Sequence, residues 1–209
     1  MDTTLFHIHD PMCSWCWAYS PVREQLKSSL PEGVKWQNLL GGLAPDTQEP
    51  MPFETRAMVK NHWRTIQKKV GTEFNFEFWD KCNPRRATYP ACRAVIAAKV
   101  QGVEERMTDA IQRAYYLRAM NPSSNTTLIQ LAGELQLRKA QFAHDLTSLE
   151  THSALLAEIG QARAMGVSSF PSLVLNTGGK WFRIPHDYHS TEPTLVAINE
   201  ALRISPPNA

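Results

Sequence analysis

Two cysteines, Cys13 and Cys16, stand within one helical turn of each other near the start of the chain. The preceding segment 5–9 is short, apolar and β-prone, so it predicts a buried strand, which Asp10-Pro11 ends. After Cys13 the apolar residues recur mostly at helical spacing. The first thiol is therefore expected at the N-terminus of a helix, where unpaired N–H groups and the helix dipole favour a thiolate.

The rest of the chain predicts an α/β sheet with a long helical stretch in its middle. Residues 34–40 read as a second strand, and residues 172–175 and 181–184 read as a hairpin. Helices are expected at about 53–69, 90–101, 104–119, 125–135, 139–149, 153–165 and 191–202. No strand is expected between the first pair of strands and the hairpin.

We therefore predict an α/β fold into which an all-helical subdomain is inserted. Residues 1–45 and 150–209 would form the α/β domain, and residues 46–149 the helical insertion. A chain of 209 residues fits one large domain with such an insertion. The longest apolar runs are far shorter than the roughly 20 residues that span a bilayer, so no membrane partner is expected.

The net charge, the N-terminal residues and the cysteine content indicate which partners and which cellular compartment to expect. A net charge of +2 without a dense Lys/Arg block gives no reason to expect nucleic acid as a partner. The start Met1-Asp2-Thr3 lacks the basic and apolar regions of a secretory signal, which favours a cytoplasmic protein. Four cysteines are too few for a disulfide scaffold, so a close pair is expected to be catalytic or metal-binding.

The Cys13–Cys16 pair admits two chemical interpretations. In thiol–disulfide exchange, Cys13 attacks and Cys16, one turn deeper, resolves the mixed disulfide. A structural zinc site needs four ligands, commonly from a second Cys-x-x-Cys or a His pair. Nine residues separate the remaining cysteines, Cys82 and Cys92, so the chain has no second such pair. The spacing favours redox chemistry and predicts no metal site; a metal-binding or chaperone-like module is the non-catalytic alternative.

A second feature, Phe170-Pro171, directly precedes the expected hairpin. Proline is tolerated at the first residue of a strand, although it removes a hydrogen-bond donor. A cis bond here would hold a flat loop beside the dithiol, and the backbone of Phe170 could pair with an extended peptide. Trp15, between the two cysteines, is expected to be exposed at the catalytic surface and to offer apolar contact to a substrate.

These features together resemble the thioredoxin superfamily, and more narrowly its DsbA-like branch, in which a helical domain interrupts the thioredoxin fold. Residues 10–17, Asp-Pro-Met-Cys-Ser-Trp-Cys-Trp, are similar to the FrnE-like group of cytosolic disulfide oxidoreductases. The resemblance implies Cys13 as nucleophile, Cys16 as resolving thiol and Pro171 as the cis-proline. It places Ser14, Trp15 and Phe170 around the substrate.

The implied activity is that of a protein disulfide oxidase, reductase or isomerase. Its partners would be protein or peptide thiols and disulfides and a cellular thiol reductant, with no resident cofactor and glutathione as a candidate cosubstrate. Periplasmic DsbA proteins carry Pro-His where this chain has Ser14-Trp15, so strong-oxidase potency is not implied. The architecture also resembles kappa-class glutathione-dependent transferases and isomerases, but these usually have Ser at the nucleophile position.

Several further residues have both a structural and a chemical interpretation. Cys82 and Cys92 could form a regulatory disulfide or relay electrons, although a half-buried structural cysteine is the simpler account. His7 and His9 share one face of the first strand, as core histidines or as an imidazolium that favours the Cys13 thiolate. Asp10 either ends the strand and caps the helix or influences the protonation of the thiols.

Overall fold

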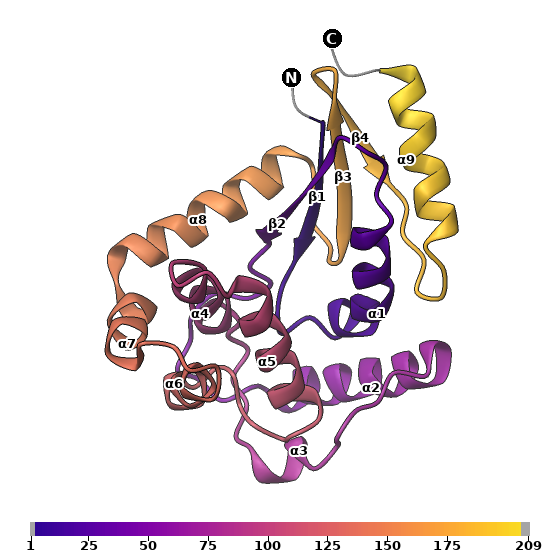
Figure 1. Ribbon diagram of the computed structural model, residues 1–209. Helices are drawn as coiled ribbons and strands as arrows, with labels where there is room; N and C mark the ends of the chain where they lie inside the picture. Colours follow the sequence, from indigo (N-terminus) through magenta and orange to yellow (C-terminus); the bar gives the residue numbers. More distant parts are fainter. Residues whose placement is uncertain (1–2, 206–209) are drawn as a thin grey trace.

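A four-stranded sheet organises one half of the molecule (Figure 1). The computed structural model describes residues 3–205, so the outermost ends of the expected α/β domain lie outside the described residues. β1 (Thr3–His9) pairs in parallel with β2 (Val34–Leu40) and antiparallel with β3 (Ser172–Thr177). β4 (Lys180–Ile184) pairs antiparallel with β3, which gives the strand order β2-β1-β3-β4.

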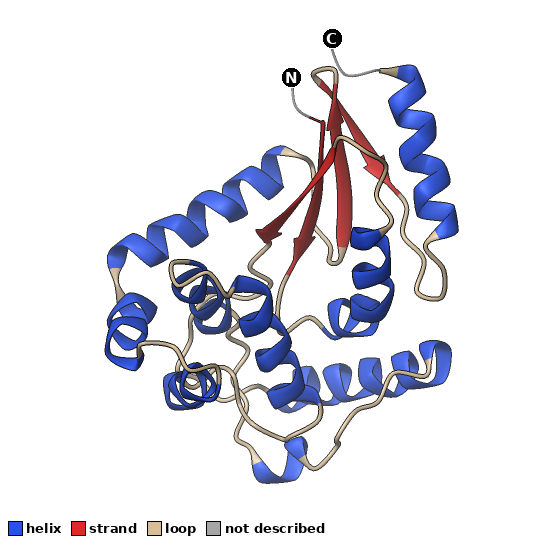
Figure 2. Cartoon of the chain, viewed as in Figure 1, coloured by secondary structure: helices blue, strands red, loops and turns tan. Residues whose placement is uncertain are grey.

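The helices fall into two groups, three that flank the sheet and a block at one end of it (Figure 2). α1 (Ser14–Ser28) makes the crossover that the parallel β1–β2 pair requires, and it continues through Pro21. The other two flanking helices are α8 (Leu149–Ala164) and α9 (Glu192–Ile204). The block contains α2 (Phe53–Val70), α3 (Phe78–Lys81), α4 (Tyr89–Lys99), α5 (Glu104–Tyr116), α6 (Asn125–Glu134) and α7 (Lys139–Thr147).

Alternating side chains of β1 fill the cores on both faces of the sheet. Leu5 packs in one cluster with Val22 of α1 and Ile198 of α9. Phe6 packs on the opposite face with Ala162 of α8. Because both faces of β1 are covered, the position of β1 is fixed. This also fixes the start of the following loop, which carries Cys13.

An aromatic cluster fills the helical block. Trp63 of α2 is fully buried, and its ring lies 4.9–5.8 Å from those of Phe74, Phe76, Phe78, Trp79, Tyr115 and Tyr116. The same core includes Met12 and Ala18, which flank the two cysteines, and Leu40 of β2. The helical block therefore packs directly against the loop and helix that carry Cys13 and Cys16.

The predicted fold class is confirmed: an α/β sheet with a helical block inserted between β2 and β3. The proposed division at residues 45/46 and 149/150 stays a prediction. The expected helices at 139–149 and 153–165 are both present, but the boundary between them lies earlier than predicted, because α7 ends at Thr147 and α8 begins at Leu149. Ser148 separates them: its Oγ accepts a hydrogen bond from the Thr151 N–H at 3.1 Å and caps α8. The short α3 was not predicted.

None of the helices within residues 3–205 combines the length and the apolar character that a bilayer crossing needs.

Replacing Trp63 with alanine should lower the free energy of unfolding by about 3–5 kcal/mol, because it removes the ring at the centre of the aromatic cluster. Phe53, on the same helix, is 84% exposed, and Phe53→Ala should change the free energy of unfolding by less than about 0.5 kcal/mol. Urea unfolding followed by circular dichroism measures both. Equal effects of the two substitutions would contradict the assignment of Trp63 to the core.

Candidate active site

The two thiols occupy different environments at the start of α1. Cys13 is the N-cap residue, in extended conformation, and its N–H donates to the Asp10 carbonyl oxygen at 3.0 Å. Cys16 lies one turn into the helix and is 3% exposed. Both are free thiols. Burial, followed by a hydrogen bond and charge interaction with Cys13, raises the pKa of Cys16 well above its usual value, so Cys16 is protonated at neutral pH.

The segment before β3 meets the Cys13 thiol. The Phe170–Pro171 peptide bond is cis, as the sequence predicted. The Cys13 Sγ donates to the Phe170 carbonyl oxygen at 3.5 Å. The Phe170 ring in turn covers Gly41, where an added Cβ would lie 2.0 Å from the Phe170 Cε1 atom. A glycine at position 41 is what lets the end of β2 and the Phe170 loop pack together beside the thiol.

A buried carboxylate lies beneath the Cys13 loop. Asp10 is fully buried, and its Oδ1 accepts a hydrogen bond from the Met12 N–H at 2.8 Å. Its Oδ2 accepts from the Leu43 N–H at 2.7 Å, from the Thr88 hydroxyl at 2.6 Å and from the Cys92 thiol at 3.5 Å. The carboxylate thus joins the active-site loop to the segment after β2 and to the start of α4. Asp10 directly follows β1, as expected of a residue that ends the strand, but the N-cap of α1 is Cys13 and not Asp10.

A cleft of about 270 Å³ opens beside Cys13. Apolar side chains, including Met12, Leu43, Met51, Val59 and Trp15, form part of its lining. Its basic lining residues are His62, Arg85 and Arg86, and no Asp or Glu of the described part of the chain lines it.

The residues expected around the substrate do meet at this cleft. Ser14, Trp15 and Phe170 all line it, and each is partly buried. Trp15 is less exposed than expected, because its ring lies 5.1 Å from that of Tyr188 in the loop before α9. Their roles in binding stay predictions.

The other two cysteines both lie outside the lining of the cleft. Cys92 is fully buried in α4, and burial raises its pKa well above the usual value. Cys82 is partly buried, its thiol donates to the Ala119 carbonyl oxygen at 3.1 Å, and burial raises its pKa as well. Both are free thiols. The redox role of this pair stays a prediction, whereas the hydrogen bond from Cys92 to Asp10 is structural.

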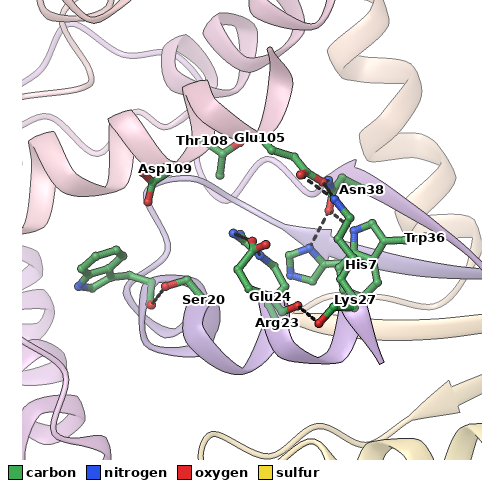
Figure 3. A network of polar contacts seen from close by, with 12 residues as sticks. His7, Ser20, Arg23, Glu24, Lys27, Trp36, Asn38, Glu105, Thr108 and Asp109 are labelled. Atoms are coloured by element: carbon green, nitrogen blue, oxygen red, sulfur yellow. Dashed lines mark hydrogen bonds and ion pairs between the residues drawn. The ribbon is translucent and has the colours of Figure 1, made fainter. Parts of the chain in front are cut away.

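His7 and His9 lie side by side inside the molecule, stacked with ring centroids 4.8 Å apart. His7 Nδ1 hydrogen-bonds to Asn38 Oδ1 at 3.0 Å, and Figure 3 shows this pair next to Trp36 and Glu105. Burial lowers the pKa of His7 well below its usual value and that of His9 to about 3. Both rings are neutral at physiological pH, so the imidazolium interpretation was wrong and the core interpretation is confirmed.

Sequence reasoning missed the basic and hydrogen-bonding residues that α4 and the segment before it bring to the site. Arg85, Arg86 and Thr88 are about 70 residues from Cys13, and only the tertiary fold brings them to the cleft. The one available signal was the Arg85-Arg86 pair directly before the expected helix start. Within the described part of the chain, no group of three or more His, Cys, Asp or Glu side chains is placed to hold a metal ion.

Sequence comparison matches residues 6–179 to a family described as Thioredoxin. Among curated proteins, the ClpXP adapter protein SpxH of Halalkalibacterium halodurans is 23% identical over 171 residues, which are 79% of this chain and 56% of that protein. SpxH of Bacillus subtilis is 23% identical over 167 residues, 78% of this chain and 55% of that protein. The chain thus spans about half the length of the curated relatives it matches.

Solved structures match over nearly the whole chain. A candidate protein disulfide isomerase from Nitrosomonas europaea has a TM-score of 0.83 and 28% identity, covering 98% of this chain and 99% of that one. The cytosolic disulfide reductase DsbM from Pseudomonas aeruginosa has a TM-score of 0.77 and 22% identity, covering 97% and 100%. At that identity the second match shows the fold alone. A further DsbM structure contains glutathione.

Replacing Asp10 with asparagine should lower the free energy of unfolding by about 2–4 kcal/mol. The amide nitrogen cannot accept a hydrogen bond, so at least one buried donor loses its partner. Asp80→Asn, at an exposed position on α3, is the matched control and should change it by less than about 0.5 kcal/mol. Urea unfolding at pH 7 compares them. Equal stabilities would show that Asp10 does not hold the loop.

The buried histidines should make the protein less stable in mild acid. His9 has a pKa of about 3 in the fold against 6.5 ordinarily, so the unfolded chain binds a proton first as the pH falls. The free energy of unfolding should therefore fall by about 2 kcal/mol for this histidine between pH 7 and pH 5. His9→Gln should flatten the pH dependence of urea unfolding, and exposed His144→Gln should not. An unchanged slope in His9→Gln would refute this.

Proposed function

Because the chain belongs to the thioredoxin family, we propose that it is a cytoplasmic thiol–disulfide oxidoreductase that works through Cys13 and Cys16. The fold supports this chemistry in general. The observation that carries the specific proposal is the different placement of the two thiols. Cys13, at the N-cap position of α1 and 7% exposed, lines the cleft, whereas Cys16, one turn behind it and 3% exposed, does not. Unpaired N–H groups of the first turn favour a thiolate at the N-cap position.

In the first step, the Cys13 thiolate attacks one sulfur of a substrate disulfide. The substrate S–S bond breaks, a mixed disulfide forms on Cys13, and the first substrate thiolate leaves. Cys16 then attacks the Cys13 sulfur, the mixed disulfide breaks, and the second substrate thiolate leaves with the proton that Cys16 gives up. The substrate gains two electrons, and the protein is left with a Cys13–Cys16 disulfide.

Burial of Cys16 suits the second step better than the first. A thiol with a raised pKa is a poor attacking group at neutral pH, so Cys16 does not compete with Cys13 for the incoming disulfide. Once the mixed disulfide has formed, Cys16 is one helical turn away from its target. Its closeness to the Cys13 sulfur then compensates for its raised pKa and makes its attack fast.

The substrate would lie along the Phe170 segment. The carbonyl oxygen of Phe170 is 3.5 Å from the Cys13 sulfur, so backbone groups of an extended substrate can pair there while its sulfur faces the thiol. A cleft of about 270 Å³ has room for a few side chains or a small peptide rather than for a folded domain. Ser14 and Trp15 would contact the substrate on the α1 side.

We propose the reductive direction, with a cellular thiol restoring the dithiol. The cytoplasmic glutathione pool keeps many exposed dithiols reduced, and two molecules of glutathione would return the Cys13–Cys16 disulfide to two thiols. One of the proteins that share this fold is described as a cytosolic disulfide reductase and was also solved with glutathione, which is compatible with this direction. Isomerase activity would need only the first step and its reversal.

Disulfide reduction by glutathione, with insulin or a small disulfide as substrate, tests the proposal. Cys13→Ser should lose at least about a hundredfold of the rate, because the attacking thiolate is gone. Cys82→Ser, which changes a partly buried thiol outside the cleft, should keep the rate within about twofold. Full activity of Cys13→Ser would overturn the proposal, and so would equal losses in both variants.

A further inference from the structure

Two arginines, Arg85 and Arg86, bring positive charge to the cleft beside Cys13. No acidic side chain of residues 3–205 lines the cleft. The buried Asp10 carboxylate hydrogen-bonds to Met12, Leu43, Thr88 and Cys92 and not to an arginine. The pKa of Asp46, outside the lining, is lowered chiefly by its hydrogen bond to Arg93 and also by the nearby charge of Arg85, so the charge of Arg85 is partly offset.

Arg85 and Arg86 differ in the hydrogen-bond partners of their guanidinium groups. The guanidinium of Arg85 donates to the Gln48 side chain and to the Ser123 carbonyl oxygen, which fixes it against the protein. For Arg86, which is partly buried, no described residue accepts a hydrogen bond from its guanidinium or forms an ion pair with it. Arg93, which is also partly buried, does have such a carboxylate, in Asp46 at 2.7 Å.

We infer that Arg86 binds a carboxylate of the substrate, so that the cleft selects disulfides with a carboxylate close to the sulfur. This inference rests on the proposed function and specifies its substrate class. A guanidinium presents a planar fork of donors that matches a carboxylate, and partial burial strengthens the pairing. Cys13 and Arg86 line the same cleft of about 270 Å³, so a substrate whose carboxylate lies near its sulfur would reach both. The carboxylate can belong to glutathione or to an acidic residue beside a cysteine in a peptide.

Arg86 would act on binding and orientation and not on the sulfur chemistry itself. The attack of Cys13 forms one S–S bond and breaks another whatever the substrate charge. Removing the guanidinium should therefore slow only those substrates that carry the carboxylate. A residue that merely supports the fold would slow all of them alike.

Three small disulfides of similar size separate these cases: dithiodiglycolate with two carboxylates, hydroxyethyl disulfide without charge, and cystamine with two ammonium groups. The measurement is the second-order rate constant for oxidation of the pre-reduced protein by each. Arg86→Gln should lower the rate for dithiodiglycolate by about tenfold and leave that for hydroxyethyl disulfide within about twofold. Arg86→Lys should retain part of the anionic preference.

Arg203→Gln is the matched control, because it removes the same charge from the exposed last turn of α9, outside the cleft. It should leave all three rates unchanged. Glutathione disulfide and a pair of blocked peptides, Glu-Cys and Gln-Cys as their disulfides, identify the source of the carboxylate. If Arg86 raises the rate constant for glutathione disulfide alone, the carboxylate belongs to glutathione. If Arg86 also raises the rate constant for the Glu-Cys disulfide above that for the Gln-Cys disulfide, the carboxylate can belong to an acidic peptide as well.

Equal losses for all three small disulfides in Arg86→Gln, or an unchanged ratio of anionic to neutral rates, would overturn the inference. If the unmodified protein is oxidised by none of them, the proposed function fails instead. Calorimetric binding of S-methylglutathione, which cannot exchange, then decides the role of Arg86 separately. Weaker binding to Arg86→Gln than to Arg203→Gln supports the inference, and equal binding overturns it.

Discussion

The buried carboxylate of Asp10 is the interaction on which the rest of the site depends. Among residues 3–205 it has no cationic partner, and it accepts hydrogen bonds from N–H, O–H and S–H donors of three separate segments of the chain. A buried carboxylate is stable only when its oxygens are hydrogen-bonded, so these segments cannot drift apart without a large free-energy cost. Asp10 therefore sets the position of the Cys13 loop relative to the helical block, and with it the shape of the cleft.

Given that fixed loop, the difference between the two thiols follows from simple geometry. Cys13 lies at the N-cap position of α1, where it lines the cleft and donates to the Phe170 carbonyl oxygen. Cys16 is one turn further along the same helix and points into protein, where burial raises its pKa. Cys13 is thus placed to attack the substrate, and Cys16 is placed to resolve the mixed disulfide afterwards. The helical block supplies the far wall, including Arg86, so that a single cleft combines sulfur chemistry with charge selection.

Local sequence patterns predicted most of the fold, because strand alternation, helical spacing and turn residues each depend on residues that are close together in the sequence. The bounds of β2 were predicted to the residue, and the Cys-x-x-Cys together with Phe170-Pro171 located the site. What could not be predicted were contacts between distant residues. The Asp10–Thr88 hydrogen bond spans 78 residues, and the packing of Phe170 on Gly41 joins the ends of two strands. Neither contact produces a pattern among neighbouring residues of the sequence, and the Arg85-Arg86 pair alone does not show that Arg86 lies beside Cys13.

The central claim is that Cys13 attacks and Cys16 resolves. The most direct test is to expose Cys16→Ser protein to glutathione disulfide and to locate the attached glutathione by peptide mass mapping. The account predicts one glutathione on Cys13 that persists, because no resolving thiol remains to release it, while Cys82 and Cys92 stay unmodified. Glutathione on Cys82 or Cys92 in place of Cys13, or no stable adduct, would contradict it.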